Sequence, residues 1–169
     1  MNCQKYWFGM TKEQYERLIA PFTNRFGRVF LRWMNRICAG VFYLAYPISI
    51  LILLVTHDSR LGKTVFIPAV SFLVLSVFRK WINRPRPYEA LDITPLLKRE
   101  SLGASFPSRH IFSAFMIAAT ISWLTPWGYL LFVPAGLLAI VRVIGGIHYP
   151  SDVIAGAVCG LLPTVFYLI

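Results

Sequence analysis

The feature that most constrains the fold of this sequence is a series of five long apolar segments separated by polar stretches. The chain has 169 residues, of which 57% are hydrophobic and 14% charged, and its mean hydropathy is +0.60. Each segment is somewhat shorter than the ~20 residues that cross a bilayer core as a helix, so flanking residues must extend the helices. The segments are Cys38–Val55, Thr64–Phe78, Ile111–Leu124, Gly128–Val143 and Val153–Ile169. The sequence therefore predicts an all-α polytopic membrane helix bundle with about five transmembrane helices.

The first 36 residues differ in character from these segments. Basic residues such as Arg25, Arg28 and Arg32 are interleaved with bulky apolar ones at helical spacing, which is typical of an amphipathic helix lying in the membrane interface. Thr11 and Gln14 are spaced to form a capping box at the start of a short helix. We expect residues 1–36 to form an interfacial segment and residues 37–169 to form the transmembrane domain. A disordered basic tail is the less favoured alternative.

Charge and cysteine content narrow the possible partners. The chain carries 17 Lys and Arg against 7 Asp and Glu, a net charge of +10. In a membrane protein this excess favours anionic headgroups or a phosphorylated substrate rather than nucleic acid. The cysteines Cys3, Cys38 and Cys159 lie far apart, in a pattern that suits neither a disulfide framework nor a metal site. The N-terminal residues show no pattern of a cleavable signal.

The stretch 142–152 joins the last two apolar segments and is expected to turn back at the membrane surface. Gly145 and Gly146 allow a tight reversal, because glycine reaches backbone angles closed to other residues. His148 is then expected just before the next helix, with Asp152 in its first turn, where the helix dipole favours a carboxylate. A histidine with a carboxylate four residues later can act as a nucleophile or base. The alternative is a loop with a satisfied surface histidine.

With five membrane helices, three polar segments fall on the same side of the bilayer. They are Arg79–Pro87, Ser105–His110 and Arg142–Asp152. Ionisable groups at membrane depth are costly and usually functional. The convergence of arginines, histidines and an aspartate from three separate segments therefore predicts a functional site on that face.

The residue types in these segments suit phosphate chemistry. Arginine presents a planar fork that matches phosphate oxygens. The candidate arginines are Arg79, Arg86 and Arg142. Ser108 stands where the third apolar segment begins, and the free backbone N–H groups of a helix start add an anion site. The two histidines, His110 and His148, can supply a nucleophile and a proton donor. The sequence contains no carboxylate cluster suited to a divalent cation, so we expect neither a metal nor a cofactor.

These segments resemble the motifs of the type 2 phosphatidic acid phosphatase (PAP2) family, which shares its core with vanadium haloperoxidases. The family pattern is Lys, six residues and Arg-Pro; then Pro-Ser-Gly-His; then Ser-Arg, five residues, His, three residues and Asp. The matching residues are Arg79 with Arg86-Pro87, Pro107-Ser108-Arg109-His110, and Val141-Arg142 with His148 and Asp152. The chain departs from the pattern at Arg79 in place of Lys, Arg109 in place of Gly and Val141 in place of Ser. The motifs cover less than half of the chain.

The resemblance implies a membrane lipid phosphatase that works through a phosphohistidine. It implies that His148 attacks phosphorus, that Asp152 orients and activates His148, and that His110 protonates the leaving oxygen. Further residues are implied to bind the phosphoryl oxygens and to stabilise their charge in the transition state. They are Arg79, Arg86, Ser108 and Arg142. Arg109 is expected either to hold a second phosphate or the headgroup, or to point to the interface.

The expected substrate is a lipid phosphate monoester or diphosphate, such as phosphatidate, phosphatidylglycerol phosphate or undecaprenyl diphosphate. A non-catalytic phospholipid binder or translocator is the main alternative, because it would keep the arginines without needing His148. A vanadate-dependent haloperoxidase is disfavoured by the apolar segments. The basic residues beside the motifs are expected to face headgroups, although Lys80 could instead support Arg79; they are Lys80, Arg84, Lys98 and Arg99. Tyr88 and Tyr149 flank the predicted site and are expected to pack at the interface.

Two arguments about orientation in the membrane disagree. Parity places the N-terminus on the side of the predicted site, and that side then holds every Lys and Arg except Arg60 and Lys63. The positive-inside tendency points this side to the cytoplasm. The resemblance implies the reverse, because bacterial members of the family generally work at the outer face. We expect a multi-pass protein of a bacterial plasma membrane with its active face outside; the oligomeric state is left open.

Overall fold

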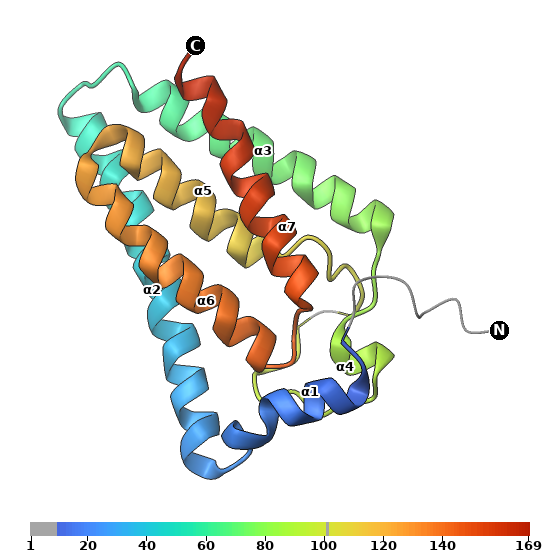
Figure 1. Ribbon diagram of the computed structural model, residues 1–169. Helices are drawn as coiled ribbons and strands as arrows, with labels where there is room; N and C mark the ends of the chain where they lie inside the picture. The colour runs from blue at the N-terminus through green and yellow to red at the C-terminus, as the bar shows by residue number, and fades with distance from the viewer. Residues whose placement is uncertain (1–9, 101) are drawn as a thin grey trace.

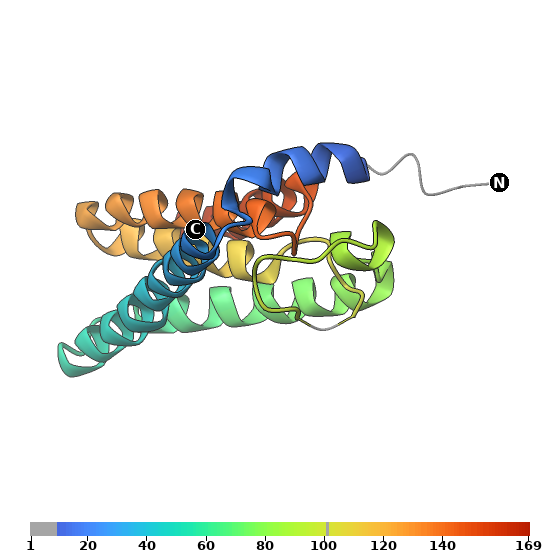
Figure 2. The ribbon, with the colours of Figure 1, turned by 90° about the horizontal axis from the view of Figure 1, so that it is seen from below.

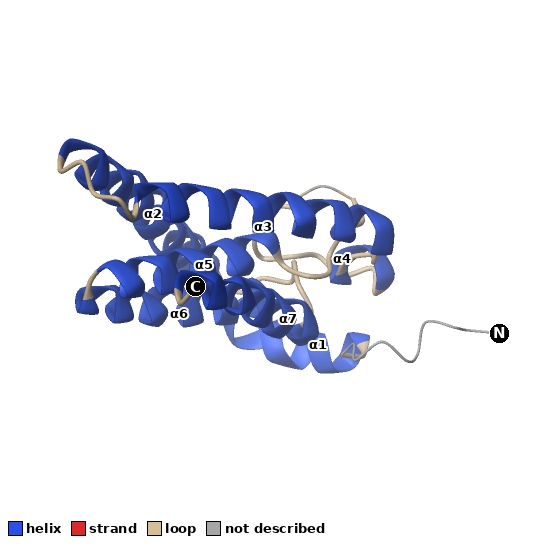
Figure 3. Ribbon diagram, turned by 90° about the horizontal axis from the view of Figure 1, so that it is seen from above, coloured by secondary structure: helices blue, strands red, loops and turns tan. Residues whose placement is uncertain are grey.

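The structure is a computed structural model that describes residues 10–100 and 102–169. These residues form helices and loops and contain no strand (Figure 1, Figure 3), which confirms the predicted all-α class. The α-helices are α1 (Lys12–Ile19), α2 (Arg25–Val55), α3 (Leu61–Ile82), α4 (Pro87–Ala90), α5 (Arg109–Leu124), α6 (Phe132–Ile144) and α7 (Pro150–Leu161). Short 3-10 helices are η2 (Ala20–Phe22), η3 (Pro126–Leu131) and η4 (Leu162–Tyr167).

Among the described residues, 4 helical stretches are long and apolar enough to cross a membrane. They are Arg25–Val55, Leu61–Ala90, Pro126–Ile144 and Pro150–Tyr167. Large apolar side chains on α2 and α3 point outward, and Leu44, Phe66 and Leu73 are all more than half exposed. Such surfaces are unfavourable in water and suit hydrocarbon, in which a helix satisfies its own backbone groups. The length and surface of these helices therefore support a multi-pass membrane protein.

The third apolar segment forms α5, which lies inside the bundle. α5 has 16 residues, or about 24 Å at the usual rise of a helix. It contacts α2, α3, α6 and α7, and Figure 2 shows it between α3 and α6. Because its neighbours cover it, α5 does not need the length of a helix surrounded by lipid. Its crossing of the bilayer as a fifth span stays a prediction.

Helix α7 packs closely on α5 through two glycines one turn apart, Gly156 and Gly160. A Cβ atom at Gly156 would lie 2.7 Å from the Ser108 carbonyl oxygen, and one at Gly160 would lie 2.6 Å from that of Phe112. Small residues at this spacing let two helix backbones approach within a membrane. The contact holds the starts of the two helices together, and the Ser108 N–H donates to the Asp152 carbonyl oxygen at 2.9 Å.

Helix α2 begins earlier than the apolar pattern predicts. The pattern starts at Cys38, but the helix starts at Arg25, inside the segment predicted to lie in the interface. Asn24 caps the helix and accepts a hydrogen bond from the Gly27 N–H at 2.6 Å. Arg28 and the other arginines of the first turns are exposed, as expected in a headgroup layer. The amphipathic stretch and the apolar span are therefore one continuous helix, because the helix can continue past the hydrocarbon.

Helix α1 packs against the end of the bundle that carries the polar motifs (Figure 1). Thr11 and Gln14 form the predicted capping box at its start. Tyr15 is fully buried, and its hydroxyl donates to the carbonyl oxygens of Val143 and His148, at 2.6 and 3.0 Å. α1 is thus fastened to the turn between α6 and α7. The predictions for residues 1–9, including Cys3, lie outside the described residues.

The turn between α6 and α7 needs its two glycines for different reasons. Gly146 has a φ of +79°, in the left-handed region, whereas Gly145 has an ordinary helical φ of −65°. Gly145 is needed for space, because a Cβ atom there would lie 2.4 Å from Leu97 Cδ1. The Leu96 and Leu97 N–H groups both donate to the Gly145 carbonyl oxygen. The prediction of an unusual backbone angle is therefore correct for Gly146 and wrong for Gly145.

Candidate active site

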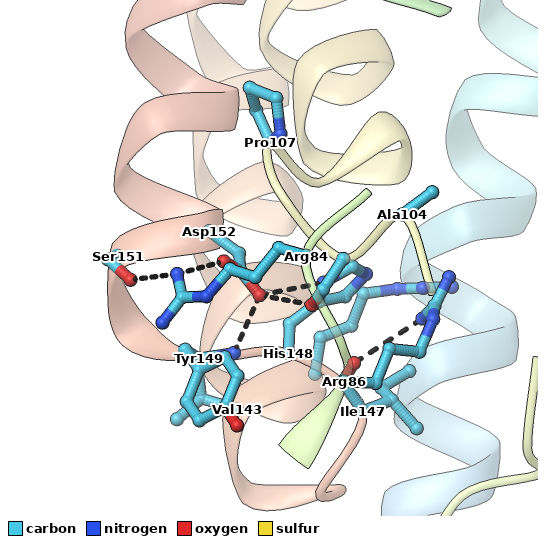
Figure 4. Close-up of polar contacts among 12 residues, drawn as sticks. Arg84, Arg86, Ala104, Pro107, Val143, Ile147, His148, Tyr149, Ser151 and Asp152 are labelled. Atoms are coloured by element: carbon cyan, nitrogen blue, oxygen red, sulfur yellow. Dashed lines mark hydrogen bonds and ion pairs between the residues drawn. The ribbon is translucent and has the colours of Figure 1, made fainter. Parts of the chain in front are cut away.

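The three polar segments meet around Asp152, which is fully buried in the first turn of α7 (Figure 4). Asp152 Oδ1 lies 2.7 Å from Arg84 Nη1. Asp152 Oδ2 accepts hydrogen bonds from the Ser105 hydroxyl and from the Tyr149 N–H, the latter at 3.0 Å. A buried carboxylate remains ionised when a cation and hydrogen-bond donors surround it. Asp152 is therefore a fixed anion at the start of α7.

His148 is 1% exposed and faces this anion. Its Nδ1 lies 3.3 Å from Asp152 Oδ2, the contact that the spacing of four residues predicts. The tautomer that donates from Nδ1 to the carboxylate leaves the lone pair on Nε2, the ring nitrogen turned away from Asp152. Burial lowers the pKa of His148 below 6.5, and Arg142 and Arg86 lower it further against the opposing effect of Asp152. The imidazole is therefore held neutral and in one orientation.

Arg86 and Arg142 are 1% and 3% exposed, and the positive charges of both act on His148. Arg86 Nη1 lies 2.9 Å from Glu100 Oε2, and Arg142 Nη1 lies 2.6 Å from Glu100 Oε1. Arg86 Nη1 also donates to the Ile147 carbonyl oxygen at 3.3 Å (Figure 4). The two guanidinium groups thus form a buried cationic pocket, which we call the arginine pocket, and Glu100 occupies it.

The third predicted arginine, Arg79, is also buried but has other partners. Its guanidinium donates to the carbonyl oxygens of Ala104 and Pro107. These residues belong to the loop that carries Ser105 and Ser108. Arg79 therefore holds the loop in place and adds positive charge beneath it, and its direct contact with a phosphate stays a prediction.

Two buried polar atoms beside the site have no hydrogen-bond partner in the part of the chain that the structure describes. They are Ser108 Oγ and Arg142 Nε. Ser108 is the N-cap of α5, yet its hydroxyl does not cap the helix. Buried polar groups are nearly always paired, so unpaired groups in a site indicate a ligand. Because a hydroxyl and a guanidinium both donate, an anion suits them.

His110 and Arg109 open α5 and line a cavity of about 420 Å³. The His110 side chain is 34% exposed, and its Nδ1 lies 3.8 Å from Glu100 Oε1. The cavity lies between α2, α3, α5 and α6, and most of its lining is apolar, including Phe42 and Phe72. His110 therefore stands between the arginine pocket and an apolar cavity. Arg109 is exposed and lines that cavity, and its contact with a phosphate stays a prediction.

Arg84 has a different role from the one that its place beside the motif predicts. The prediction that it faces headgroups is wrong, because it is 8% exposed and bonded to Asp152 and to Ser151 Oγ, the latter at 2.8 Å. Its guanidinium also lies on the Tyr149 ring, with Cζ 4.2 Å from the centroid. Tyr149 is 5% exposed and so belongs to the site rather than to the membrane interface. The sequence feature that indicates a role in the site is the position of Arg84, two residues before Arg86 in the first motif segment.

Two further site residues received no role from the sequence. Ser105 opens the second motif segment, so its hydroxyl could have been assigned from its place beside Ser108. Glu100 lies between the motif segments in a basic stretch, and nothing in its neighbours indicates that it reaches the arginines. The remaining basic residues near the motifs, Lys80 and Lys98 among them, are exposed as expected.

The match to known proteins covers the same three segments. The sequence profile of the PAP2 superfamily matches residues 60–169, which include every motif residue described above. The chain belongs to the PAP2 superfamily. In this PAP2 chain, the motif histidines, the aspartate and the arginines are those that the structure gathers at one end of the bundle.

Individual relatives agree with this assignment. The undecaprenyl-diphosphatase of Sulfolobus acidocaldarius is 31% identical over 121 residues, which are 70% of this chain and 59% of that protein. Phosphatidylglycerophosphatase B of Bacillus subtilis is 29% identical over 160 residues, which are 81% of this chain and 74% of that protein. The crystal structure of Aquifex aeolicus LpxE matches with a TM-score of 0.75 at 23% identity over 99% of both chains. The PAP2 chain therefore shares its whole fold with a solved structure, although it spans only 59% of the first relative's length.

Proposed function

We propose that this PAP2 chain is a metal-independent membrane phosphatase that hydrolyses a phosphate monoester or diphosphate of a lipid. The observation that carries the proposal is the buried His148–Asp152 pair, with 3.3 Å between Nδ1 and Oδ2, beside Arg86 and Arg142. A neutral, oriented imidazole is a nucleophile. Two buried guanidinium groups can balance the charge of a phosphoryl group without a divalent cation.

In the first step the phosphoryl group lies in the arginine pocket, within reach of the Ser108 hydroxyl. His148 Nε2 attacks phosphorus, and the bond from phosphorus to the lipid oxygen breaks. Burial and Arg142 lower the pKa of His110 to about 4 without substrate, so His110 takes up a proton when the phosphoryl anion lies beside it. His110 gives this proton to the lipid oxygen, and the lipid leaves as an alcohol, or as a monophosphate if the substrate is a diphosphate. Asp152 stabilises the positive charge that develops on the His148 ring.

In the second step water replaces the lipid. His110, now neutral, takes a proton from the water as its oxygen attacks phosphorus. The bond from phosphorus to His148 Nε2 breaks, which restores the neutral imidazole and releases inorganic phosphate. The same side chain thus acts as acid and then as base, as in other two-step transfers. Arg86 and Arg142 stabilise the charge of both transition states.

The cavity beside His110 supports a lipid as the substrate. Its volume of about 420 Å³ and its largely apolar lining suit a hydrocarbon chain, and its wall carries His110, which must reach the leaving oxygen. We therefore place the lipid chain there, with the phosphate in the arginine pocket. The names of two relatives, for undecaprenyl diphosphate and for phosphatidylglycerophosphate, support this substrate class.

The proposal is tested by phosphate release from the purified protein in detergent with EDTA present. The substrates are phosphatidate, phosphatidylglycerol phosphate and undecaprenyl diphosphate, and we expect turnover of at least one. His148→Ala should abolish turnover while the protein stays folded in detergent. Activity of this variant within a few-fold of the wild type would contradict the assignment of His148 as the nucleophile. Loss of activity in EDTA with recovery in Mg²⁺ would contradict metal independence, and phosphate binding without any turnover would favour a binding protein.

A further inference from the structure

Glu100 occupies the arginine pocket that the proposed function reserves for the phosphoryl group. Its two carboxylate oxygens are divided between Arg142 Nη1 at 2.6 Å and Arg86 Nη1 at 2.9 Å. His110 Nδ1 lies 3.8 Å from one of the same oxygens. The carboxylate therefore contacts two of the cations assigned to phosphate binding and stands close to the acid that serves the leaving group.

The pocket needs an anion whether or not a substrate is bound. Arg86 and Arg142 are both almost fully buried, and a buried guanidinium without a counterion is strongly unfavourable. Glu100 supplies that counterion in the structure. A phosphoryl group would approach the same Nη1 atoms, and two anions cannot both lie against them without strong repulsion. Binding of phosphate thus requires the carboxylate to leave.

The surroundings of Glu100 allow this exchange without a change of fold. The loop is fastened before it by the Leu97 N–H, which donates to Gly145, and after it by the Gly103 N–H, which donates to Glu89. The Glu100 carbonyl oxygen accepts a hydrogen bond from the Tyr88 hydroxyl at 3.3 Å. The side chain itself is 26% exposed, so it can rotate toward solvent while the backbone stays in place.

We propose that Glu100 is an internal competitor for the phosphate site, which phosphate displaces from Arg86 and Arg142 and which returns when inorganic phosphate leaves. This proposal rests on the proposed function, which assigns the arginine pocket as the phosphate site. The competition weakens the binding of every phosphoryl ligand by the same factor. It therefore raises KM for the lipid and speeds the release of inorganic phosphate, and Glu100 is an affinity-determining residue rather than a catalytic one.

The exchange does not depend on protonation of Glu100 at ordinary pH. Burial opposes its ionisation, but Arg142, His110 and Arg86 outweigh this and lower the pKa of Glu100 to about 2. The carboxylate is therefore charged throughout the range in which the protein would work. Only another anion can replace it.

The test is the affinity of the purified protein in detergent for inorganic phosphate, measured by isothermal titration calorimetry, which needs no turnover. Glu100→Gln removes the competing charge, and we expect its Kd for phosphate to fall by about tenfold or more, the scale of one charge-assisted contact. The control is Asp92→Asn, which removes one charge from an exposed position in the same loop and should leave Kd within about twofold. An unchanged or raised Kd in Glu100→Gln would overturn the proposal and make Glu100 a support for the arginines.

A second variant and a second measurement test the proposal if Glu100→Gln folds poorly. Glu100→Asp keeps the charge, but its side chain is too short to bridge both arginines. Its Kd for phosphate should therefore lie between those of the wild type and Glu100→Gln. A Kd equal to or above that of the wild type would count against the proposal. Because phosphate replaces a lost counterion, it should raise the unfolding midpoint of Glu100→Gln more than that of the wild type. A wild type that binds phosphate but hydrolyses no lipid would refute the proposed function alone.

Discussion

Arg84 Nη1 lies 2.7 Å from Asp152 Oδ1, and the two side chains are 8% and 0% exposed. The other carboxylate oxygen, Oδ2, faces His148 Nδ1 and the hydroxyl of Ser105. Arg84 therefore fixes the rotation of the carboxylate, which in turn fixes the ring of His148. It acts on the proposed reaction through Asp152 and is a positioning residue.

The first prediction concerns this pair. Arg84→Ala should destabilise the protein by about 3–5 kcal/mol, because it leaves Asp152 buried without its cation. Arg84→Lys keeps the charge but cannot bond Asp152 and Ser151 together, so it should recover most of the stability and only part of kcat. Unfolding midpoints and kcat for the two variants are the measurements. Equal kcat in Arg84→Lys and the wild type would remove the positioning role.

The second prediction is that kcat/KM is lost at acid pH with a midpoint below the usual pKa of histidine. His148 must be neutral to attack, so activity falls as the pH drops through its pKa. Burial lowers the pKa of His148 below 6.5, so the midpoint of this loss should lie below pH 6.5. The second ionisation of the phosphate ester, near pH ~6, also changes kcat/KM and is corrected for first. The chain has 3 histidines, so replacing His57 and His110 by Gln leaves one signal for an NMR titration. A midpoint at or above pH 6.5 would contradict the assignment.

The third prediction separates the role of His110 by leaving group. His110→Ala should slow the hydrolysis of lipid phosphates much more than that of p-nitrophenyl phosphate, because a good leaving group needs less protonation. The comparison is the ratio of kcat/KM for the two substrates. His57→Ala is the matched control, since His57 is exposed between α2 and α3, and should change neither value. An equal loss of kcat/KM on both substrates would count against His110 as the acid.

The fourth prediction tests the contact of α5 with α7. Gly156→Ala places a methyl group 2.7 Å from the Ser108 carbonyl oxygen, so the helices must separate, at a cost of about 1–3 kcal/mol. Because the same contact aligns Ser108 with Asp152, kcat should fall as well. Gly40→Ala is the control, because a Cβ atom at Gly40 meets nothing within 4 Å. It should leave kcat unchanged and raise the unfolding midpoint slightly, since alanine favours a helix more than glycine does. Similar midpoints for the two variants would argue against a close α5–α7 contact.

The fifth prediction is that the active face lies outside the cytoplasm. A single cysteine at Lys98, an exposed residue of the loop beside the site, should react with a membrane-impermeant maleimide in whole cells. The native cysteines are removed from the background. A cysteine at Ser59, between α2 and α3 at the far end of the bundle, should react only after the cells are opened. The opposite pattern would show that the positive-inside tendency governs this chain.

Interactions between residues close together in the chain were predictable. The His148–Asp152 contact spans four residues, and the capping box of α1 spans three. Both lie at a helix start, where the local backbone brings the residues just before the helix close to those of its first turn, whatever surrounds the helix. The apolar segments predicted the membrane helices for a similar reason, because the bilayer imposes the same requirement on each one separately.

Helix boundaries were less predictable, because they depend on what lies beside the helix. The start of α2 at Arg25 is hidden in a basic, aromatic stretch that also suits a separate interfacial helix. The helix begins at Arg25 because Asn24 caps it, accepting a hydrogen bond from the Gly27 N–H. Composition alone does not distinguish a continuous helix from two.

The sequence by itself determined the membrane bundle, the three motifs and the pairing of His148 with Asp152. Only the tertiary structure placed Arg84 on Asp152, 68 residues away, and Glu100 on Arg142, 42 residues away. A charged residue beside a motif can face either headgroups or the buried site, and local pattern is the same in both cases. The outcome depends on which cation or anion lies opposite after the helices pack, since a buried charge is stable only beside its partner.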